Sequence, residues 1–294
     1  MQIFDSTPCQ LGEGPLWHPL NQELYWFDIL AKKMFRKRLN SQKIDQWQFN
    51  EHVSAAAWID QDHLLIASES ALIKLNISGV HCDNSQQIIC PLEADIPNNR
   101  SNDGRADPWG GFWIGTMDKQ AKSAAGGIYR YYLGELVALK TQLSIPNSIC
   151  FTANKQFAYY TDTREQIIWR QQLDLQAGWP IGEAELFIDL RPQNLNPDGA
   201  ICDRQGNLWV AQWGASRIAQ YSAKGQFLQA ISIPTAQPTC PAFGATNFTK
   251  MFVTSASQGL SDTELTAQPA GQTFCIDLKV PGLAEHPVIL GKKI

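Results

Sequence analysis

Short apolar segments alternate with polar turns along the whole chain, and no stretch has the spacing of a long amphipathic helix. The clearest example begins at Asn147, a polar residue that opens a short apolar segment. A turn follows, then an aromatic-rich segment at 156–162, and then a third apolar segment at 166–170. Because each segment is short and is bounded by turn residues, we predict that these segments are β-strands.

The aromatic-rich segment recurs six times, and its copies begin about 40 to 50 residues apart. Most copies follow a turn that contains Gly, Asn, Asp or Lys, and another short apolar segment follows each copy. Six such units predict an all-β fold, a six-bladed β-propeller that forms a single domain over residues 1–294. The alternative is a β-sandwich, or a two-domain all-β chain, in which the similarity is accidental. The six copies begin at Leu24, Leu64, Phe112, Phe157, Leu208 and Met251.

The last unit predicts how the ring closes. It runs over residues 239–276 and contains a polar stretch at 259–271, which we expect to be a loop. The tail at 280–294 is expected to pair back and close the ring, because closure removes exposed sheet edges.

The first strand of every propeller blade lines the central channel, so residues at equivalent positions of these strands converge on the axis. These positions lie ten residues before each aromatic-rich segment. In the first unit the turn is one residue longer, so Glu13, one residue before the counted position Gly14, is expected to take the place in the ring. The six positions found in this way are Gly14, Ser54, Asn102, Asn147, Asp198 and Pro241.

Polar side chains of this ring are expected to share one mouth of the channel; they are Glu13, Asn102, Asn147 and Asp198. Two carboxylates and amide oxygens that converge there predict a site for a hard divalent cation. Pro precedes both Asn147 and Asp198 and fixes the backbone just before each candidate ligand. The alternatives are an exposed turn for Glu13 and an ordinary Pro-Asp-Gly turn for Asp198.

A run of polar and charged residues precedes the third aromatic-rich segment and is a second candidate region. Arg100 can donate two parallel hydrogen bonds to an oxygen-rich ligand, and Asn102 offers both a donor and an acceptor. Asp103 lies beside them in the sequence. A solvated loop is the alternative. After the next strand, Asp118 and Gln120 either reach a ligand or lie exposed in solvent, and the sequence leaves both open.

Composition and charge exclude several classes of protein. The net charge is −4, charged residues make up 18% of the chain and there is no basic stripe, so nucleic acid is not an expected partner. No apolar run approaches the roughly 20 residues of a membrane helix, and the first ten residues lack the pattern of a signal peptide. The seven Cys are scattered without a C-x-x-C pair, which predicts reduced thiols and a cytoplasmic protein.

Five stretches form a set that is specific in this order: Leu-Gly-Glu-Gly-Pro-Leu-Trp at 11–17, Arg-Ser-Asn-Asp-Gly at 100–104, Phe-Trp-Ile-Gly-Thr-Met at 112–117, Ile-Pro-Asn-Ser at 145–148 and Pro-Asp-Gly at 197–199. On these stretches, which span nearly the whole domain, the chain resembles the senescence-marker/regucalcin/gluconolactonase family. The resemblance implies a six-bladed propeller. Many bacterial members of this family are sugar lactonases.

The resemblance also implies roles for residues already singled out. It implies one divalent metal ion held by Glu13, Asn147 and Asp198. It implies that Arg100 and Asn102 hold the hydroxyl groups of the substrate. The identity of the metal stays open among Ca²⁺, Zn²⁺, Mg²⁺ and Mn²⁺, because all four accept oxygen ligands.

Together with these residues, the resemblance implies a metal-dependent sugar lactonase that hydrolyses an aldonolactone, such as gluconolactone or arabinonolactone, to the aldonic acid in carbohydrate catabolism. The metal would act as a Lewis acid on the lactone carbonyl. Asp198, which can also meet the attacking water, is the candidate general base. Some animal members carry an acidic substrate contact where this chain has Gln120, so the sugar preference stays open. Gln120 and Asp103 are counted as further candidate substrate contacts.

Three other functions are open. A metal-dependent esterase or phosphotriesterase on a similar propeller predicts a more apolar entrance than the loop around Arg100 offers. A calcium-binding regulatory protein without turnover needs the same metal ligands. A protein-interaction platform would not need charged residues that converge on the axis.

Overall fold

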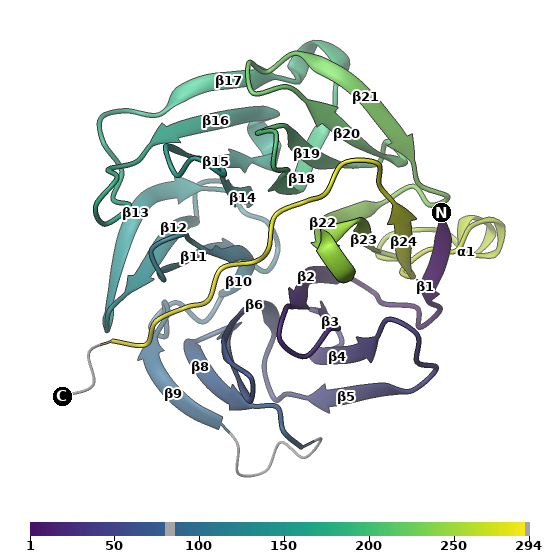
Figure 1. Cartoon of the computed structure of the whole chain (residues 1–294), viewed down its shortest axis with the longest axis horizontal. Coiled ribbons are helices and arrows are strands. Elements are labelled where there is room, and N and C mark those ends of the chain that lie inside the picture. Colours follow the sequence, from purple (N-terminus) through teal and green to yellow (C-terminus); the bar gives the residue numbers. More distant parts are fainter. Residues whose placement is uncertain (80–85, 292–294) are drawn as a thin grey trace.

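The protein forms a closed ring of six antiparallel sheets with four strands each, in a computed structural model that describes residues 1–79 and 86–291 (Figure 1). Almost every described element is a strand, and the exceptions are one short α-helix and three 3-10 helices. This is a six-bladed β-propeller, so the predicted fold class is confirmed. Over the described residues, no helix is long and apolar enough to cross a membrane.

The strands follow one another from the channel outward in the first five blades. Blade 1 contains β2 (Gly12–His18), β3 (Glu23–Asp28), β4 (Lys33–Arg38) and β5 (Ile44–Gln48). Blade 2 contains β6 (Val53–Asp60), β7 (His63–Ser68), β8 (Ala71–Asn76) and β9 (Gln86–Pro91). Blade 3 contains β10 (Asn99–Ala106), β11 (Phe112–Asp118), β12 (Gly126–Tyr132) and β13 (Glu135–Leu143).

The second half of the ring repeats this order. Blade 4 contains β14 (Pro146–Phe151), β15 (Phe157–Asp162), β16 (Ile167–Gln172) and β17 (Glu185–Asp189). Blade 5 contains β18 (Asn196–Cys202), β19 (Leu208–Trp213), β20 (Arg217–Tyr221) and β21 (Phe227–Ser232). Blade 6 contains β22 (Pro238–Gly244), β23 (Lys250–Ser255), β24 (Thr273–Asp277) and β1 (Gln2–Asp5). The helices are η1 (Thr163–Glu165), η2 (Arg191–Gln193), η3 (Thr246–Phe248) and α1 (Asp262–Ala267).

The N-terminal strand closes the ring. Gln2 of β1 pairs with Cys275 of β24, so the outer strand of blade 6 comes from the start of the chain. The expectation that the tail would close the ring is wrong, because β1 already occupies this edge of β24. Residues 279–291 form no strand and instead cross one face of the ring (Figure 1). Residues 292–294 of the predicted segment lie outside the described residues. The stretch expected to be a loop contains α1.

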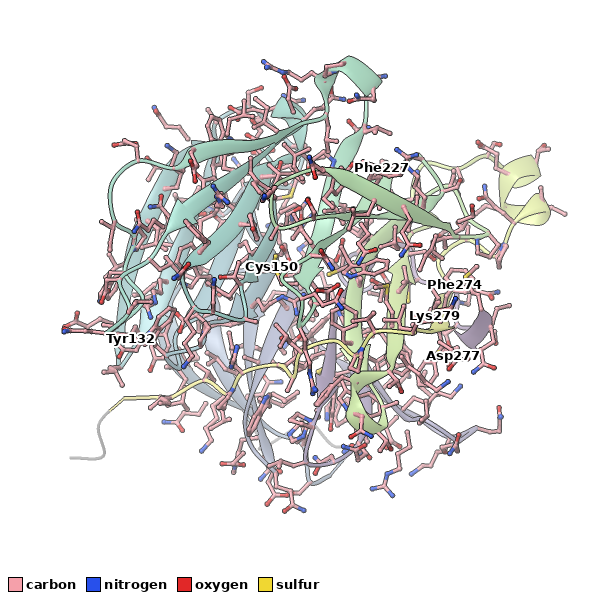
Figure 2. All side chains as sticks on the ribbon, turned by 45° about the horizontal axis from the view of Figure 1, so that its top comes forward. Tyr132, Cys150, Phe227, Phe274, Asp277 and Lys279 are labelled. Atoms are coloured by element: carbon pink, nitrogen blue, oxygen red, sulfur yellow. The ribbon has the colours of Figure 1, made fainter. Side chains whose placement is uncertain are left out.

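Aromatic side chains pack between neighbouring blades. Trp17 of β2 stacks on Phe252 of β23 with ring centroids 5.4 Å apart, which joins blades 1 and 6. Trp113 of β11 meets Phe151 of β14 edge to face at 5.4 Å, which joins blades 3 and 4. In Figure 2, Cys150 lies near the centre of the ring on the innermost strand of its blade. The aromatic residues of the repeat therefore serve mainly as core.

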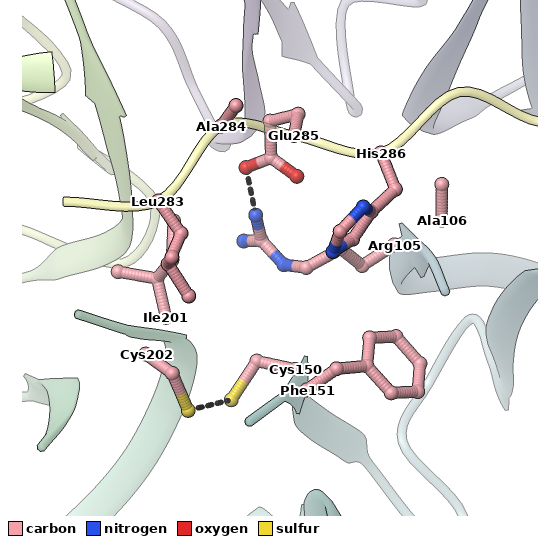
Figure 3. Close-up of a pocket in the computed structure, with 10 residues that line it drawn as sticks. All are labelled: Arg105, Ala106, Cys150, Phe151, Ile201, Cys202, Leu283, Ala284, Glu285 and His286. Carbon is pink, nitrogen blue, oxygen red and sulfur yellow. Dashed lines mark hydrogen bonds and ion pairs between the residues drawn. The ribbon is translucent and has the colours of Figure 1, made fainter. Parts of the chain in front are cut away.

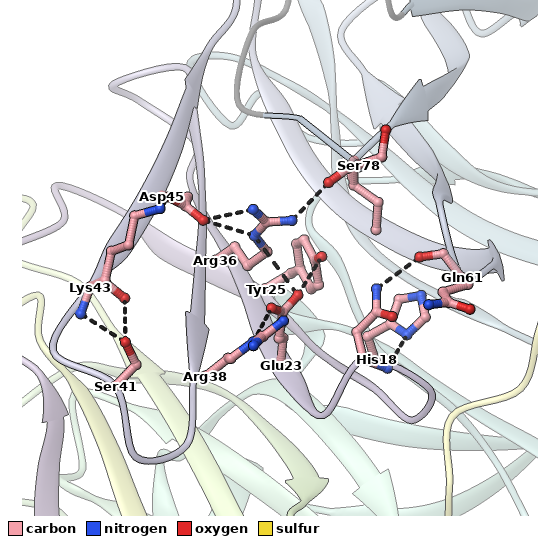
Figure 4. A network of polar contacts seen from close by, with 12 residues as sticks. His18, Glu23, Tyr25, Arg36, Arg38, Ser41, Lys43, Asp45, Gln61 and Ser78 are labelled. Carbon is pink, nitrogen blue, oxygen red and sulfur yellow. Dashed lines mark hydrogen bonds and ion pairs between the residues drawn. The ribbon is translucent and has the colours of Figure 1, made fainter.

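A buried carboxylate organises the outer strands of blade 1 (Figure 4). Glu23, at the start of β3, accepts hydrogen bonds from the Tyr25 hydroxyl at 3.1 Å and from the Arg38 Nε at 2.8 Å. Arg36 donates to Asp45 of β5 at 2.6 Å. This network crosses three strands and ties them together, and none of its residues lines the cavity at the mouth of the channel.

Every first strand departs from regular pairing with its neighbour close to the same level of the channel. On β2 the irregularity lies between Glu13 and Leu16, and on β14 it lies between Asn147 and Cys150. Comparable irregularities occur on β6, β10, β18 and β22. A bulge leaves residues outside the ladder and re-aims their side chains. The repeated bulges thus turn polar side chains of several blades toward the axis.

Candidate functional site

A cavity of about 530 Å³ opens at one mouth of the channel. The starts of the first strands form its floor, and loops that follow the second strands form its rim. Its volume is in the range of about 300 to 1,000 Å³ that is usual for small-molecule sites. The predicted residues that line it are Glu13, Arg100, Asn102, Gln120, Asn147 and Asp198. The structure therefore brings six of the predicted residues together at one cavity.

Two carboxylates lie buried at this cavity. Glu13 is 8% exposed and Asp198 is 5% exposed. The Gly14 backbone N–H donates to Glu13 at 3.0 Å, and no side chain among the described residues donates a hydrogen bond to either carboxylate. Burial, and then the charge of Asp103, raises the pKa of Glu13 to about 8. Burial, and then the charge of Glu13, raises the pKa of Asp198 well above its ordinary range.

Asn147 is held at both ends of its amide. Its Nδ2 donates to the Thr163 hydroxyl at 2.9 Å, and that hydroxyl donates to the Pro197 carbonyl at 2.8 Å. Its Oδ1 accepts from Asn102 Nδ2 at 3.0 Å. The two bonds fix which end of the amide is the oxygen, and they link β14 to the segment that carries Asp198.

The backbone after each candidate ligand of blades 1 and 4 is left-handed. Gly14 has φ +54°, and a Cβ there would lie 2.1 Å from the Ser54 carbonyl oxygen, so only glycine fits. Ser148 has φ 58° although it carries a side chain. Its hydroxyl donates to the backbone carbonyl of Asp198. Sequence reasoning missed the roles of Ser148 and Thr163, because their partners lie on another blade.

Arg100 and Asn102 form the wall next to these groups. Arg100 Nη1 donates to Asn102 Oδ1 and to the Ser101 carbonyl, both at 2.8 Å. Among the described residues, Arg100 Nε and Nη2 have no hydrogen-bond acceptor. The residue is 7% exposed and lines the cavity. Burial lowers the pKa of Arg100 to about 10, so the guanidinium is still protonated near neutral pH. It can therefore offer two N–H groups to a ligand.

Two other candidates lie away from the cavity lining. Asp103 is buried below the floor, where its carboxylate accepts from the Ile149 backbone N–H at 2.7 Å. It lines a smaller cavity deeper in the channel, so a direct substrate contact by Asp103 finds no support in this geometry. Asp118 is buried and accepts from the Gln120 backbone N–H at 2.7 Å, which orders the rim loop. The exposed Gln120 lines the cavity together with its neighbours Lys119 and Ala121, whereas Asp118 does not.

Comparisons with known proteins show the family of the chain. A family model described as the SMP-30/Gluconolactonase/LRE-like region matches residues 11–257. The chain belongs to this family. Family membership was implied by the five stretches of the sequence and is confirmed.

Relatives in this family cover nearly the whole chain. L-arabinolactonase of Azospirillum brasilense is 33% identical over 291 residues, which are 96% of this chain and 93% of that protein. The 6-deoxy-6-sulfogluconolactonase of Pseudomonas putida is 32% identical over 289 residues, which are 97% and 96% of the two chains. A calcium-binding protein, regucalcin, from Agrobacterium tumefaciens superposes with a TM-score of 0.93 at 36% identity, over 98% of this chain and 96% of that chain.

The charges along the channel fit a divalent cation. The buried charged residues that line its cavities are the carboxylates Glu13, Asp103, Asp198 and Glu285 and the guanidinium groups of Arg100 and Arg105. With all six ionised, the channel carries a net charge of −2, which one divalent cation would cancel. The described residues include no cluster of three or more His, Cys, Asp and Glu suited to a metal. The candidate set has two carboxylates and one amide, an all-oxygen set that suits a hard cation.

Proposed function

We propose that this protein is a divalent-metal-dependent lactonase that hydrolyses a sugar lactone to the open-chain acid. The observation that carries the proposal is the pair of buried carboxylates, Glu13 and Asp198, which face a cavity of substrate size without side-chain donors. Buried carboxylates without partners are costly, and a bound cation offsets that cost. The lactonase names of the relatives support a hydrolase that acts on lactone bonds.

Glu13, Asn147 and Asp198 would hold the cation. Three protein ligands leave coordination positions for water and substrate, as catalytic sites require. A bound divalent cation supplies a Lewis acid that polarises the lactone carbonyl and stabilises the negative charge on its oxygen. The amide of Asn147 needs no reorganisation for this role, because Thr163 and Asn102 already fix it.

Arg100, Asn102 and Gln120 would bind the hydroxyl groups of the sugar. Arg100 presents unpartnered N–H groups from a buried position, whereas Gln120 lies on the exposed rim. Binding through fixed donors holds the lactone ring at one distance from the attacking water. Gln120 is neutral, so it can both donate to and accept from a substrate hydroxyl.

Asp198 is the proposed general base. It accepts a proton from water while the water oxygen forms a bond to the lactone carbonyl carbon. When the bond between this carbon and the ring oxygen breaks, the ring oxygen takes the proton from Asp198 and becomes the hydroxyl of the product. The water has then been split between the new carboxyl group and the new hydroxyl group. Asp198 lines the cavity, so its carboxylate can contact a water molecule bound there.

Two other functions use the same residues. An esterase or phosphotriesterase would need apolar groups around the entrance, and Leu30 and Trp213 do contribute to the cavity wall. The rim, however, also carries Lys119, Gln120 and Arg164, which favours a polyhydroxylated substrate. A calcium-binding regulatory protein needs the metal ligands alone, and it does not explain the unpartnered Nε and Nη2 donors of Arg100.

Acid release from a panel of lactones tests the proposal. The panel holds arabinono-, xylono-, glucono- and galactonolactone, each with chelator or with added Ca²⁺, Mg²⁺, Mn²⁺ or Zn²⁺, and a pH indicator follows the reaction. Spontaneous hydrolysis is subtracted. We expect metal-dependent turnover of one or two sugars. If folded protein shows no turnover above background with any metal, the lactonase proposal is wrong and the binding functions gain support.

The cellular setting is also a proposal. The six described cysteines, Cys9, Cys90, Cys150, Cys202, Cys240 and Cys275, are free thiols. Free thiols agree with a reducing compartment and thus with the predicted role in the cytoplasm.

A further inference from the structure

The C-terminal segment at 279–291 forms a strap across one face of the ring (Figure 1). The residues of this strap that line a cavity lie at the end of the channel opposite the candidate site. Backbone N–H groups of the strap bind three separate blades. Gly282 donates to the Phe248 carbonyl of blade 6 at 2.8 Å, Val288 donates to the Trp58 carbonyl of blade 2 at 2.9 Å, and Ile289 donates to the Gly110 carbonyl of blade 3 at 2.8 Å. The segment is therefore fixed at both sides of the channel that it crosses.

Glu285 lies midway along this strap and enters the channel. It is 7% exposed, and its backbone carbonyl accepts from Trp58 Nε1 at 2.9 Å. Its carboxylate forms a buried ion pair with Arg105 (Figure 3). The cavity beside this pair is only about 20 Å³, so the strap closes the channel at this end. Within the part of the chain that the structure describes, the large cavity that holds the candidate ligands lies at the opposite mouth.

Arg105 connects four of the six blades. It belongs to β10 of blade 3, and its Nε donates to the Ile149 carbonyl of blade 4 at 3.1 Å. Its Nη2 donates to the Ala200 carbonyl of blade 5 at 3.2 Å and lies 4.0 Å from Cys240 Sγ of blade 6. A single guanidinium thus sets the distances between neighbouring first strands.

The two carbonyl partners of Arg105 are close to the candidate ligands. Ile149 is two residues from Asn147, and Ala200 is two residues from Asp198. The Ile149 peptide is held on its other side as well, because its N–H donates to Asp103 at 2.7 Å. Side chains of β10 therefore hold the bulge of β14 on which the left-handed Ser148 lies.

We propose that Arg105 and Glu285 form a positioning pair that sets the separation of Asn147 and Asp198, so that the C-terminal strap is a working part of the cation site at the other end of the channel. The proposal rests on the assignment of these two residues as metal ligands under the proposed function. Glu285 contacts neither substrate nor metal, and it acts through Arg105.

The negative charge of Glu285 compensates the positive charge of the buried Arg105 guanidinium. Without it, the buried Arg105 guanidinium is left with Asp103, two residues along the same strand, as the other carboxylate that lines the same small cavity. Attraction of Asp103 to Arg105 would draw it away from the Ile149 N–H. The bulge that carries Asn147 and Ser148 would then lose one of its anchors.

Calorimetric titration of Ca²⁺ into chelator-treated full-length protein tests this pair. The Glu285→Gln variant keeps the shape of the side chain and removes its charge. We expect its dissociation constant for Ca²⁺ to rise about tenfold, as for other groups that orient metal ligands. Glu285→Asp should recover part of this loss. We also expect the kcat of Glu285→Gln to fall more than its KM changes.

The matched control is Asp107→Asn. Asp107 and Arg130 form a second buried ion pair, with Nε and Oδ2 2.7 Å apart and both side chains 0% exposed, and neither lines the site cavity. This variant also leaves a buried guanidinium without its carboxylate, so its melting temperature should fall as well. Its Ca²⁺ affinity and KM should match the wild type.

If Glu285→Gln folds poorly, the apolar double variant Arg105→Met with Glu285→Leu replaces it in the titration. Proteins usually tolerate exchange of a whole buried ion pair for apolar groups, so this variant should fold. It should bind Ca²⁺ as weakly as Glu285→Gln. Wild-type Ca²⁺ affinity in either variant would overturn the proposal. A wild-type protein that binds Ca²⁺ but turns over no lactone would disprove only the lactonase function. If the wild type binds none of Ca²⁺, Mg²⁺, Mn²⁺ and Zn²⁺ in the same titration, both proposals are overturned.

Discussion

The hydroxyl of Ser148 donates a hydrogen bond to the backbone carbonyl of Asp198, across the boundary between blades 4 and 5. Ser148 is fully buried and left-handed, a conformation that costs a non-glycine residue roughly 1 to 2 kcal/mol. The structure keeps this costly conformation where the bond joins two segments that each carry a candidate metal ligand. The bond therefore fixes one ligand relative to the other.

Removal of this hydroxyl should weaken metal binding. In Ser148→Ala, the Asp198 carbonyl loses its side-chain donor, and we expect a stability loss of about 1 kcal/mol together with a severalfold weaker Ca²⁺ affinity. Ser54→Ala is the matched control, because Ser54 donates an equally buried hydroxyl bond to Ser101 at 2.7 Å between blades 2 and 3. Calorimetry should show altered Ca²⁺ affinity for Ser148→Ala alone. Equal affinities in the two variants would assign Ser148 a purely structural role.

Asp198→Asn should separate activity from stability. The change keeps the side-chain shape but removes the proposed base, so we expect kcat to fall by at least about 100-fold. The same change removes one of two repelling buried carboxylates, so the metal-free protein should melt at a higher temperature than the wild type. Asp203→Asn is the comparison, since Asp203 is buried but accepts structural bonds such as that from Trp209 Nε1 at 3.0 Å. That variant should lose stability and keep kcat.

The stability of the metal-free protein should fall as pH rises. The Glu13 pKa is about 8 in the folded protein, above the roughly 4.3 of an unfolded glutamate. Between these values the folded state binds more protons than the unfolded state, so the free energy of unfolding decreases with rising pH. A cation replaces the proton, and the gain in melting temperature on adding Ca²⁺ should therefore be larger at about pH 8 than at about pH 6.

Glu13→Gln provides the control for this pH dependence. The amide does not titrate, so the metal-free melting temperature should fall less over the same interval. The measurement is differential scanning calorimetry of chelator-treated protein across the pH series. A wild-type protein whose metal-free stability rises between about pH 5 and 8 would show that Glu13 is not held in this environment.

Arg100→Lys tests the substrate contact. Lysine keeps the charge but cannot donate two parallel hydrogen bonds, so kcat/KM should fall by about tenfold or more, mainly through KM. The Ca²⁺ affinity should stay within about twofold, because Arg100 is not a proposed ligand. Arg164→Lys on the exposed rim is the matched control and should change KM less. An unchanged KM in Arg100→Lys would mean that the sugar does not contact this guanidinium.

The repeat made most of this site predictable from the sequence. Once the six units are aligned, the geometry of a propeller predicts that Glu13, Asn147 and Asp198 face one channel, without knowledge of any distance between them. In the structure all three line one cavity. The position of Asp103 was not predicted by this reasoning, because it lines the deeper cavity and not the site cavity. It follows Asn102 directly, but both lie at the bulge of β10, and Asp103 extends deeper into the channel. A sequence pattern with a period of two does not describe a bulge.

The closing strand and the strap could not be told apart from the sequence. Both chain ends contain short apolar stretches next to polar residues, and either could have paired with β24. The choice depends on long-range contacts, such as that of Ile3 with Phe274, which leave no local signal. The contacts of Ser148 and Thr163 were missed for the same reason, because each joins two blades.

The pairing of β1 with β24 has a consequence for how the chain matures. Blade 6 needs residues 2–5 and residues 273–277 at once, so it cannot form on the ribosome before β24 has emerged. Glu13 lies just after β1 and is made well before Asp198, yet the two face one cavity only when the ring shuts. Cation capture should therefore coincide with the last step of folding, and a nascent chain should not sequester metal ions before it is complete.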